Sequence, residues 1–275
     1  MSFRRGGPNG SDEAANRDQM SASGVVDTGP GTGTGAGTDP YRAAAEKQSK
    51  AQTIRTEARL SVPIETDVLS MDMAAIEQLD AFREVRTRLI AMGNAQGRNF
   101  FTTLVVGITG SCGASFVARN LAGAFTLQEE RVAMLVDCNL RNPTQHKVLG
   151  VQADDGGLFD YLERPFAAVE RLAHPTPIPG LHLIPAGQPS EMPREYFSSQ
   201  HMRMLMNALA QAPCYVFLDG PAVKGSPDAR ILAELVDFVV LVVGYASATP
   251  DEIGQAVKLF DPAKFAGVVF NDHTS

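Results

Sequence analysis

The sequence is poor in the features that mark membrane and secreted proteins. It has nothing near the roughly 18 consecutive apolar residues of a membrane-spanning helix, and its strongest apolar run, at 238–243, has the length of a strand. Arg4 and Arg5 are not followed by the apolar segment of a secretory signal. The three cysteines, Cys112, Cys138 and Cys214, lack metal-ligand spacing and are odd in number. We therefore expect reduced thiols and a cytoplasmic protein without direct membrane insertion.

An excess of positive charge is also lacking. The net charge is −7, and residues 1–50 hold six basic and six acidic residues, so the excess of acid lies further along the chain. Proteins that bind the phosphate backbone of nucleic acids are normally basic. Nucleic acid is therefore not expected as a partner.

The first 40 residues lack Leu, Ile, Tyr and Trp but hold nine of the 25 glycines. Such a segment cannot bury enough apolar surface to offset the entropy that is lost on ordering. We expect a disordered N-terminal arm and linker at 1–60 and a single folded domain at 61–275.

Within that domain, short apolar runs alternate with segments of helical periodicity. The runs are continuously apolar, which indicates strands that are buried on both faces, as in a mostly parallel sheet covered by helices on both sides. The sequence thus predicts an α/β fold. The expected strands are 102–109, 132–137, 181–185, 215–219, 238–243 and 266–271, and the expected helices are 76–92, 115–127, 195–211, 228–235 and 251–260.

Three of the predicted strands lead into residues that could bind a ligand or take part in a reaction. The first is followed by a turn rich in Gly and Ser at 109–115, and the others end at Asp137 and Asp219. Ligands of parallel sheets bind where the carboxyl ends of the strands meet, so these segments should converge. Two strand-end carboxylates with the Ser115 hydroxyl form a candidate magnesium site.

The turn only partly matches the phosphate-loop pattern of Gly, four residues, Gly, Lys and then Ser or Thr. Gly113 and Ser115 fit, but Ile108 replaces the first Gly, Ala114 replaces the Lys, and no Lys or Arg occurs at 100–118. Two alternatives remain open from the loop alone. One is a purely structural turn, and the other is a site for NAD, because glycines at 107, 110 and 113 are spaced by threes and an acidic residue ends the next strand.

Six motifs in register favour one family. They are DAFREVRTR at 80–88, the loop, VAMLVDCNLRNP at 132–143, LIPAG at 183–187, YVFLDGP at 215–221, and the pair of DA at 228–229 and VVFN at 268–271. In order and spacing they resemble the bacterial tyrosine kinases, P-loop proteins that regulate the polymerisation and export of capsular or extracellular polysaccharide. The resemblance covers about residues 76–271 and implies a P-loop NTPase-like three-layer sandwich.

The resemblance assigns the nucleotide and metal sites. Asp137 and Asp219 would be the catalytic carboxylates of an active member, and with Ser115 they would hold Mg²⁺. The second acid of the family's Asp-x-Asp-x-Arg motif is Asn139 here, which leaves Arg141 as its last member. The nucleotide-binding positions would be Gly110, Ser111, Cys112, Gly113, Ala114, Ser115, Arg141 and Asn271, the last beside the adenine base.

A further motif of the family lies on the first predicted helix. Its Glu-x-x-Arg-x-x-Arg motif, implicated in contacts between the subunits of a ring, corresponds to Asp80, Arg83 and Arg86. These residues are the candidate interface. The last 30 residues contain no tyrosine, whereas kinases of the family autophosphorylate a tyrosine-rich tail.

The missing lysine and the missing acid predict a degenerate site, since phosphoryl transfer depends on charge neutralisation. The resemblance implies weak binding of ATP or ADP with Mg²⁺ and a regulatory or scaffolding role. The expected partners are a membrane polysaccharide co-polymerase, which would recruit the chain to the inner face of the cytoplasmic membrane, and further copies of the chain. The alternatives are an active tyrosine autokinase and a positioning ATPase of the ParA/MinD type.

Overall fold

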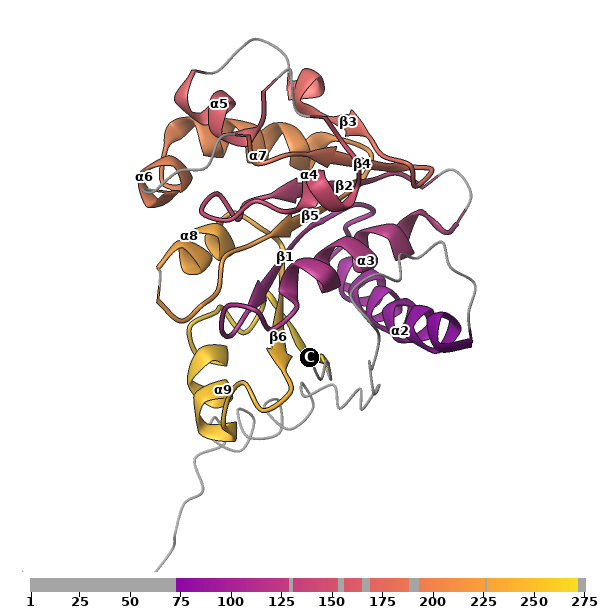
Figure 1. Ribbon diagram of the computed structural model, residues 1–275. Coiled ribbons are helices and arrows are strands. Elements are labelled where there is room, and N and C mark those ends of the chain that lie inside the picture. The colour runs from indigo at the N-terminus through magenta and orange to yellow at the C-terminus, as the bar shows by residue number, and fades with distance from the viewer. Residues whose placement is uncertain are drawn as a thin grey trace, which may run out of the picture. The chain divides into compact units, whose positions relative to one another are not determined.

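Seven strands form one sheet in the order β3-β4-β2-β5-β1-β6-β7 (Figure 1). Every neighbouring pair is parallel except β3 with β4. The strands are β1 (Thr102–Gly107), β2 (Ala133–Asp137), β3 (His174–Pro175), β4 (Leu181–Ile184), β5 (Tyr215–Asp219), β6 (Phe238–Gly244) and β7 (Phe265–Asn271).

This computed structural model describes residues 73–128, 131–152, 156–164, 169–187, 193–225 and 227–271, all in one compact unit. The predicted arm and linker at 1–60 lie outside these residues. The helices are α2 (Met73–Ala95), α3 (Ala114–Thr126), α4 (Gln145–Val148), α5 (Leu158–Glu163), the 3₁₀ helix η1 (Val169–Leu172), α6 (Pro193–Phe197), α7 (Gln200–Gln211), α8 (Asp228–Glu234) and α9 (Pro250–Val257).

The helices cover the sheet on both faces, as the continuous apolar strands predicted. Helices α2 and α3 pack on one face, and α5 to α9 pack on the other. Successive strand residues enter opposite cores, so Leu104 of β1 packs with the second group and Val105 with the first. The predicted three-layer α/β sandwich is therefore confirmed.

One predicted helix, 195–211, is wrong in its extent. The structure divides this segment into α6 and α7, because Ser199 is extended and its side chain accepts a hydrogen bond from the Met202 backbone N–H at 3.1 Å. This serine is an N-cap, which satisfies a backbone donor that a continuous helix would have bonded internally. The apolar stripe of α7 is core as predicted, since Met202, Leu205 and Leu209 are buried.

Strand β3 was not predicted at all. It has two residues and pairs with β4 in the antiparallel sense, at the edge of the sheet. So short a strand leaves no periodic pattern in the sequence.

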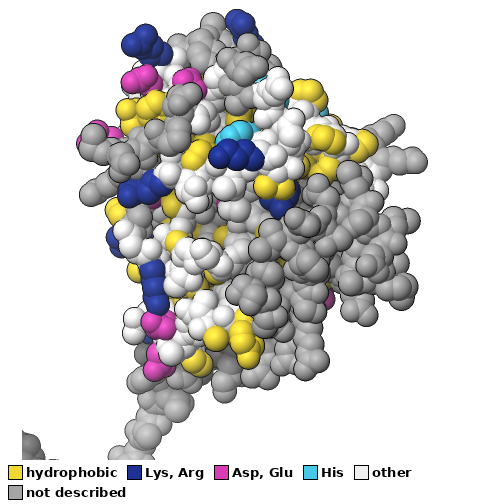
Figure 2. All heavy atoms as spheres, in the orientation of Figure 1, with side chains coloured by type: hydrophobic (Ala, Val, Ile, Leu, Met, Phe, Trp, Pro, Cys, Tyr) yellow, Lys and Arg dark blue, Asp and Glu magenta, His cyan; other side chains and the backbone are white. Residues whose placement is uncertain are grey.

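Two further observations concern the cysteines and the length of the helices. Cys112, Cys138 and Cys214 are all free and buried. None of the helices in the described part of the chain combines the length and the apolar character that crossing a bilayer requires. On the face in Figure 2, Lys and Arg side chains stand apart from one another, with Asp and Glu among them.

Candidate functional site

The loop between β1 and α3 is turned sharply by two residues with positive φ. They are Ser111, with φ 61°, and Gly113, with φ 84°, which is the N-cap of α3. A Cβ on Gly113 would collide with the side-chain amide of Asn271, so glycine is required both by the backbone and by the close approach. Gly110 is exposed at the turn, with no atom within 4 Å of the place of its missing Cβ.

Asn271 ends β7 and ties that strand to the loop. Its Nδ2 donates to the Cys112 carbonyl oxygen at 3.1 Å, and the residue is only 5% exposed. The Cys112 thiol points inward, where its Sγ donates to the Val242 carbonyl oxygen at 3.6 Å. Burial raises the pKa of this thiol, which keeps it protonated. Asn271 and Cys112 thus hold the loop in shape.

The predicted carboxylates come together. Asp137 and Asp219 are register partners on the adjacent strands β2 and β5, and neither is exposed. Burial raises the pKa of Asp137 to about 7, and the charge of Asp219 adds to this shift. Burial also raises the pKa of Asp219 to about 6, against the hydrogen bonds from Gln145 and Ser115 and the charge of Arg119.

Protein donors surround both carboxylates. Asp137 accepts backbone N–H groups from Asn139 at 3.1 Å through one oxygen, and from Thr144 at 3.3 Å and Gln145 at 3.2 Å through the other. These bonds fold the segment after β2 back over the strand end. Asp137 therefore shapes this loop through both of its oxygens.

Asp219 is bonded from two side chains. The Ser115 hydroxyl donates to its Oδ1 at 3.1 Å, and the Gln145 amide donates to its Oδ2 at 2.7 Å. The same amide donates to the Ser115 carbonyl oxygen at 2.9 Å, and its Oε1 accepts from Arg119 at 3.2 Å. Helices α3 and α4 meet β2 and β5 at this corner of the sheet (Figure 1).

These contacts test whether the predicted magnesium ligands fit a metal ion. Ser115, Asp137 and Asp219 converge as expected, and carboxylate oxygens are the donors that Mg²⁺ prefers. All four carboxylate oxygens, however, already accept N–H or O–H groups. Among the described residues, no group of three or more His, Cys, Asp or Glu has the arrangement of a metal site. Hydrogen bonds between protein groups hold the Ser115, Asp137 and Asp219 side chains in this arrangement.

The loop contains no lysine, but the backbone of one lysine, Lys224, bonds to the residue at the start of the loop. Ala114 occupies the lysine position, half-buried at the start of α3. Lys224, which follows β5, donates its backbone N–H to the Ile108 carbonyl oxygen at 3.1 Å. Its ammonium is directed to Glu252 at the start of α9, with Nζ and Oε1 2.6 Å apart. The lysine whose backbone bonds to the start of the loop therefore has its ammonium paired with Glu252.

Arg141 lies at the rim of the site. Its guanidinium is about half exposed and stands 3.4 Å from the buried carboxylate of Asp228, the first residue of α8. Asn139 is half-buried, and its backbone N–H is engaged by Asp137. The predicted phosphate-contacting arginine therefore has a structural partner on a different element.

The three candidate interface residues differ in their environments. Asp80 and Arg83 form an exposed pair on α2, 2.7 Å apart. Arg86 instead donates to the Ala124 carbonyl oxygen at 2.7 Å and fixes α2 to α3, and burial lowers its pKa. Asp80 and Arg83 are the more exposed of the three, and Arg86 is partly buried.

Sequence reasoning missed Gln145, Arg119 and Lys224. One signal was present for Arg119, because it is the only charged residue of α3 and is just 8% exposed. Gln145 and Lys224 lie in segments with no motif and reach the site through tertiary contacts alone.

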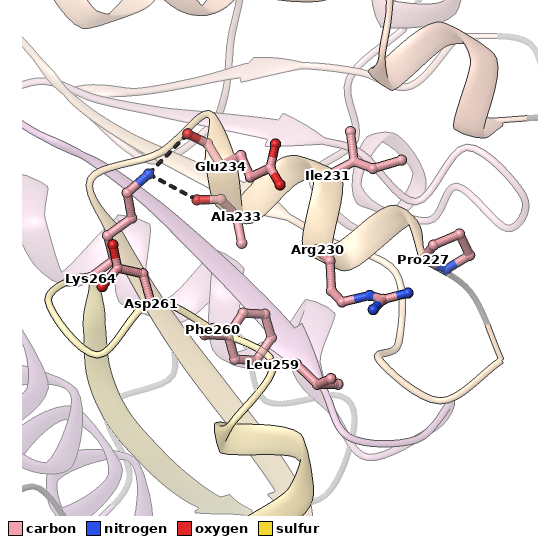
Figure 3. A pocket seen from close by; sticks show the side chains of 9 residues that line it. All are labelled: Pro227, Arg230, Ile231, Ala233, Glu234, Leu259, Phe260, Asp261 and Lys264. Carbon is pink, nitrogen blue, oxygen red and sulfur yellow. Dashed lines mark hydrogen bonds between the residues drawn. The ribbon is translucent and has the colours of Figure 1, made fainter. Parts of the chain in front are cut away.

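A separate cavity of about 650 Å³ lies between α8 and the segment that joins α9 to β7 (Figure 3). Phe260 and Leu259 contribute apolar walls, and Arg230 projects from α8. Lys264 is directed to the end of α8, where its Nζ donates to the carbonyl oxygens of Ala233 at 3.3 Å and Glu234 at 2.9 Å. None of the predicted site residues lines this cavity.

Comparison with known proteins gives consistent relatives. No protein-family model matches the chain. The chain is 31% identical to the tyrosine-protein kinase Wzc of Salmonella typhi over 196 residues. The aligned segment makes up 70% of this chain and 26% of that protein. The chain is 25% identical over 214 residues to the tyrosine-protein kinase YwqD of Bacillus subtilis, 76% of this chain and 86% of that protein.

The solved structures agree with the sequence relatives. The BceF tyrosine kinase domain superposes with a TM-score of 0.62 at 25% identity, over 84% of this chain and 86% of that domain. The chain spans about a quarter of the length of Wzc and most of the length of YwqD.

Proposed function

The chain belongs to the bacterial tyrosine kinase family, and from this premise we propose that it regulates or scaffolds polysaccharide synthesis and export. Its partner would be a membrane co-polymerase of capsular or extracellular polysaccharide, which recruits it to the inner face of the cytoplasmic membrane. In this proposal the nucleotide loop keeps a structural role after losing efficient kinase chemistry.

The observation that carries the proposal is the state of the loop. Ala114 stands in the lysine position, and Lys224, the cation that comes alongside, is paired with Glu252. A charge-assisted contact to phosphate is worth about 1.5–3 kcal/mol in binding. Loss of such a contact from a transition state commonly slows a reaction by about a hundredfold or more. Weak binding of ATP or ADP through the loop backbone, without efficient phosphoryl transfer, follows from these magnitudes.

The surfaces proposed for partners are the nucleotide-loop face and the exposed part of α2. Asp80 and Arg83 are solvent-accessible there and lie one helical turn apart. An exposed pair of this kind contributes little to the stability of the domain, so its charges are free to exchange partners at low cost. We assign Arg83 to contacts with the co-polymerase or with a second copy of the chain.

A complementation experiment tests the role in polysaccharide production. Cells that lack the chain should lose extracellular polysaccharide, and both the wild type and Asp219→Asn should restore it. Asparagine suits this site because its oxygen can accept from Gln145 while its Nδ2 donates to the Ser115 hydroxyl. An active autokinase predicts instead that Asp219→Asn fails to complement although it is folded and present.

Calorimetry with ATP tests the degenerate loop separately. The wild type should bind weakly, and Ala114→Lys should bind at least about tenfold more tightly, since it restores the charge-assisted contact. Tight binding by the wild type, with phosphotyrosine forming on incubation, would refute the loss of kinase chemistry.

A further inference from the structure

The Gln145 side chain occupies the centre of the carboxylate corner. It is fully buried at the start of α4, and its amide nitrogen lies 2.7 Å from Asp219 Oδ2 and 2.9 Å from the Ser115 carbonyl oxygen. Both of those groups only accept hydrogen bonds. The amide must therefore present its NH₂ to them, which uses both of its hydrogens and fixes its orientation.

The other end of the amide meets a buried cation. Arg119 donates from Nη1 to Gln145 Oε1 at 3.2 Å, and its guanidinium carbon lies 5.8 Å from the centre of the Phe116 ring. The positive charge of Arg119 polarises the amide, which strengthens the hydrogen bond that the amide donates to Asp219. A chain of donors runs from Arg119 through Gln145 to Asp219.

These contacts stabilise the buried Asp219 carboxylate, which in many proteins is done by a bound metal ion. A buried carboxylate is costly unless it is paired or coordinated. In the described part of the molecule, Asp219 is compensated by Ser115 on Oδ1 and by Gln145 on Oδ2. An apolar residue of similar size at position 145 would leave Oδ2 without this donor.

We propose that Gln145, backed by Arg119, is a built-in substitute for a divalent cation beside Asp219. The pair keeps the corner assembled without metal and prevents Mg²⁺ from reaching Asp219 Oδ2. This deepens the proposed function and rests on it, since it gives a structural reason why metal-dependent phosphoryl transfer is lost. Restoring the loop lysine alone would accordingly leave the chain without its metal.

Thermal unfolding in EDTA and in about 10 mM Mg²⁺, without nucleotide, tests this substitution. The wild type should unfold at the same temperature in both solutions. Gln145→Glu places a carboxylate against Asp219, so its Tm in EDTA should fall by about 5–10 °C, and Mg²⁺ should recover most of that loss by bridging the two carboxylates. Gln255→Glu on α9 is the matched control, because that glutamine is exposed and the variant should not respond to Mg²⁺.

Two further variants make the outcome decisive. Gln145→Leu frees Oδ2 without adding charge and should show a smaller loss in EDTA with a smaller recovery in Mg²⁺. Adding Asp219→Asn to Gln145→Glu should abolish the recovery. A variant that does not fold in EDTA should regain its far-UV circular dichroism when Mg²⁺ is added.

The proposal is overturned if Mg²⁺ raises the Tm of the wild type through Asp219, or if neither variant at position 145 responds to Mg²⁺. These outcomes are independent of polysaccharide production. Failure of complementation would therefore refute the proposed function while leaving the metal substitution intact, and the reverse also holds.

Discussion

Replacing Gly113 by alanine should destabilise the domain through two separable effects. At φ 84°, a residue with a Cβ costs about 1–2 kcal/mol in backbone strain. The added methyl would also displace the Asn271 amide, which now donates to the Cys112 carbonyl oxygen at 3.1 Å. Leaving that buried acceptor unpaired costs about 1–3 kcal/mol. The unfolding free energy should fall by about 2–5 kcal/mol, and the Tm by about 5–15 °C.

Gly97 offers a matched control for this prediction. It has φ 69° and no atom within 4 Å of its missing Cβ, so Gly97→Ala carries the backbone strain without the collision. That variant should lose only about 1–2 kcal/mol. Urea denaturation of both proteins measures the difference, which isolates the contact with Asn271.

A double-mutant cycle completes the test. Asn271→Ala alone removes the hydrogen bond to Cys112, but in the Gly113→Ala background it also makes room for the new methyl group. The two substitutions should therefore cost about 1–2 kcal/mol less together than the sum of their separate effects. Equal losses for Gly113→Ala and Gly97→Ala, with additive behaviour in the cycle, would refute the argument that Asn271 constrains the loop.

Three other predictions follow from the same structure. The unfolding free energy should fall as the pH rises from about 4 to about 7. Folding raises the pKa of Asp137 to about 7 and that of Asp219 to about 6, so the folded state binds more protons than the unfolded state in this range. Asp219→Asn should weaken this pH dependence in urea titrations at pH 5 and pH 8, and a difference in stability between the two proteins that is the same at both pH values would contradict the prediction. The pKa of Glu252 is lowered to about 2, mainly by the hydrogen bond from Lys224. Lys224→Met should therefore raise the pKa of Glu252 toward 4.5 in an NMR titration. An unchanged titration midpoint of Glu252 would exclude this hydrogen bond in solution. Phe125 is fully buried and packs against Tyr215 with tilted rings, whose centres lie 4.7 Å apart. Phe125→Ala should lower the unfolding free energy by about 3–5 kcal/mol, and a loss below about 1.5 kcal/mol would mean that the core is not packed as described.

The sheet was predictable because its strands are buried on both faces. Segments such as β5 and β6 are continuously apolar and end close to the predicted positions. Helix boundaries were harder to predict. The helical spacing of Met202 and Leu205 does not indicate that the helix starts only after Ser199. The local hydrogen bond of a single serine decided where α7 begins.

The candidate site was predictable at the strand ends and at the start of α3. Asp137 and Asp219 were found because parallel strands bring their carboxyl ends to one edge. The interface motif was predicted as one unit, yet Arg86 turns inward to Ala124 while Arg83 stays exposed. Helical spacing places residues on a face, but the packing of α3 against α2 decides which of them bonds within the domain.

The sequence by itself determined the α/β layers, the loop without its lysine and the pair of buried acids, because each depends on residue types in a local pattern. Only the tertiary structure decided what those acids bond to. Gln145 reaches Asp219 across 74 positions and meets Arg119 across 26, so no local pattern records either contact. Hydrogen bonds between buried side chains depend on the direction in which each side chain leaves its element, and that direction exists only once helices α3 and α4 have packed against strands β2 and β5.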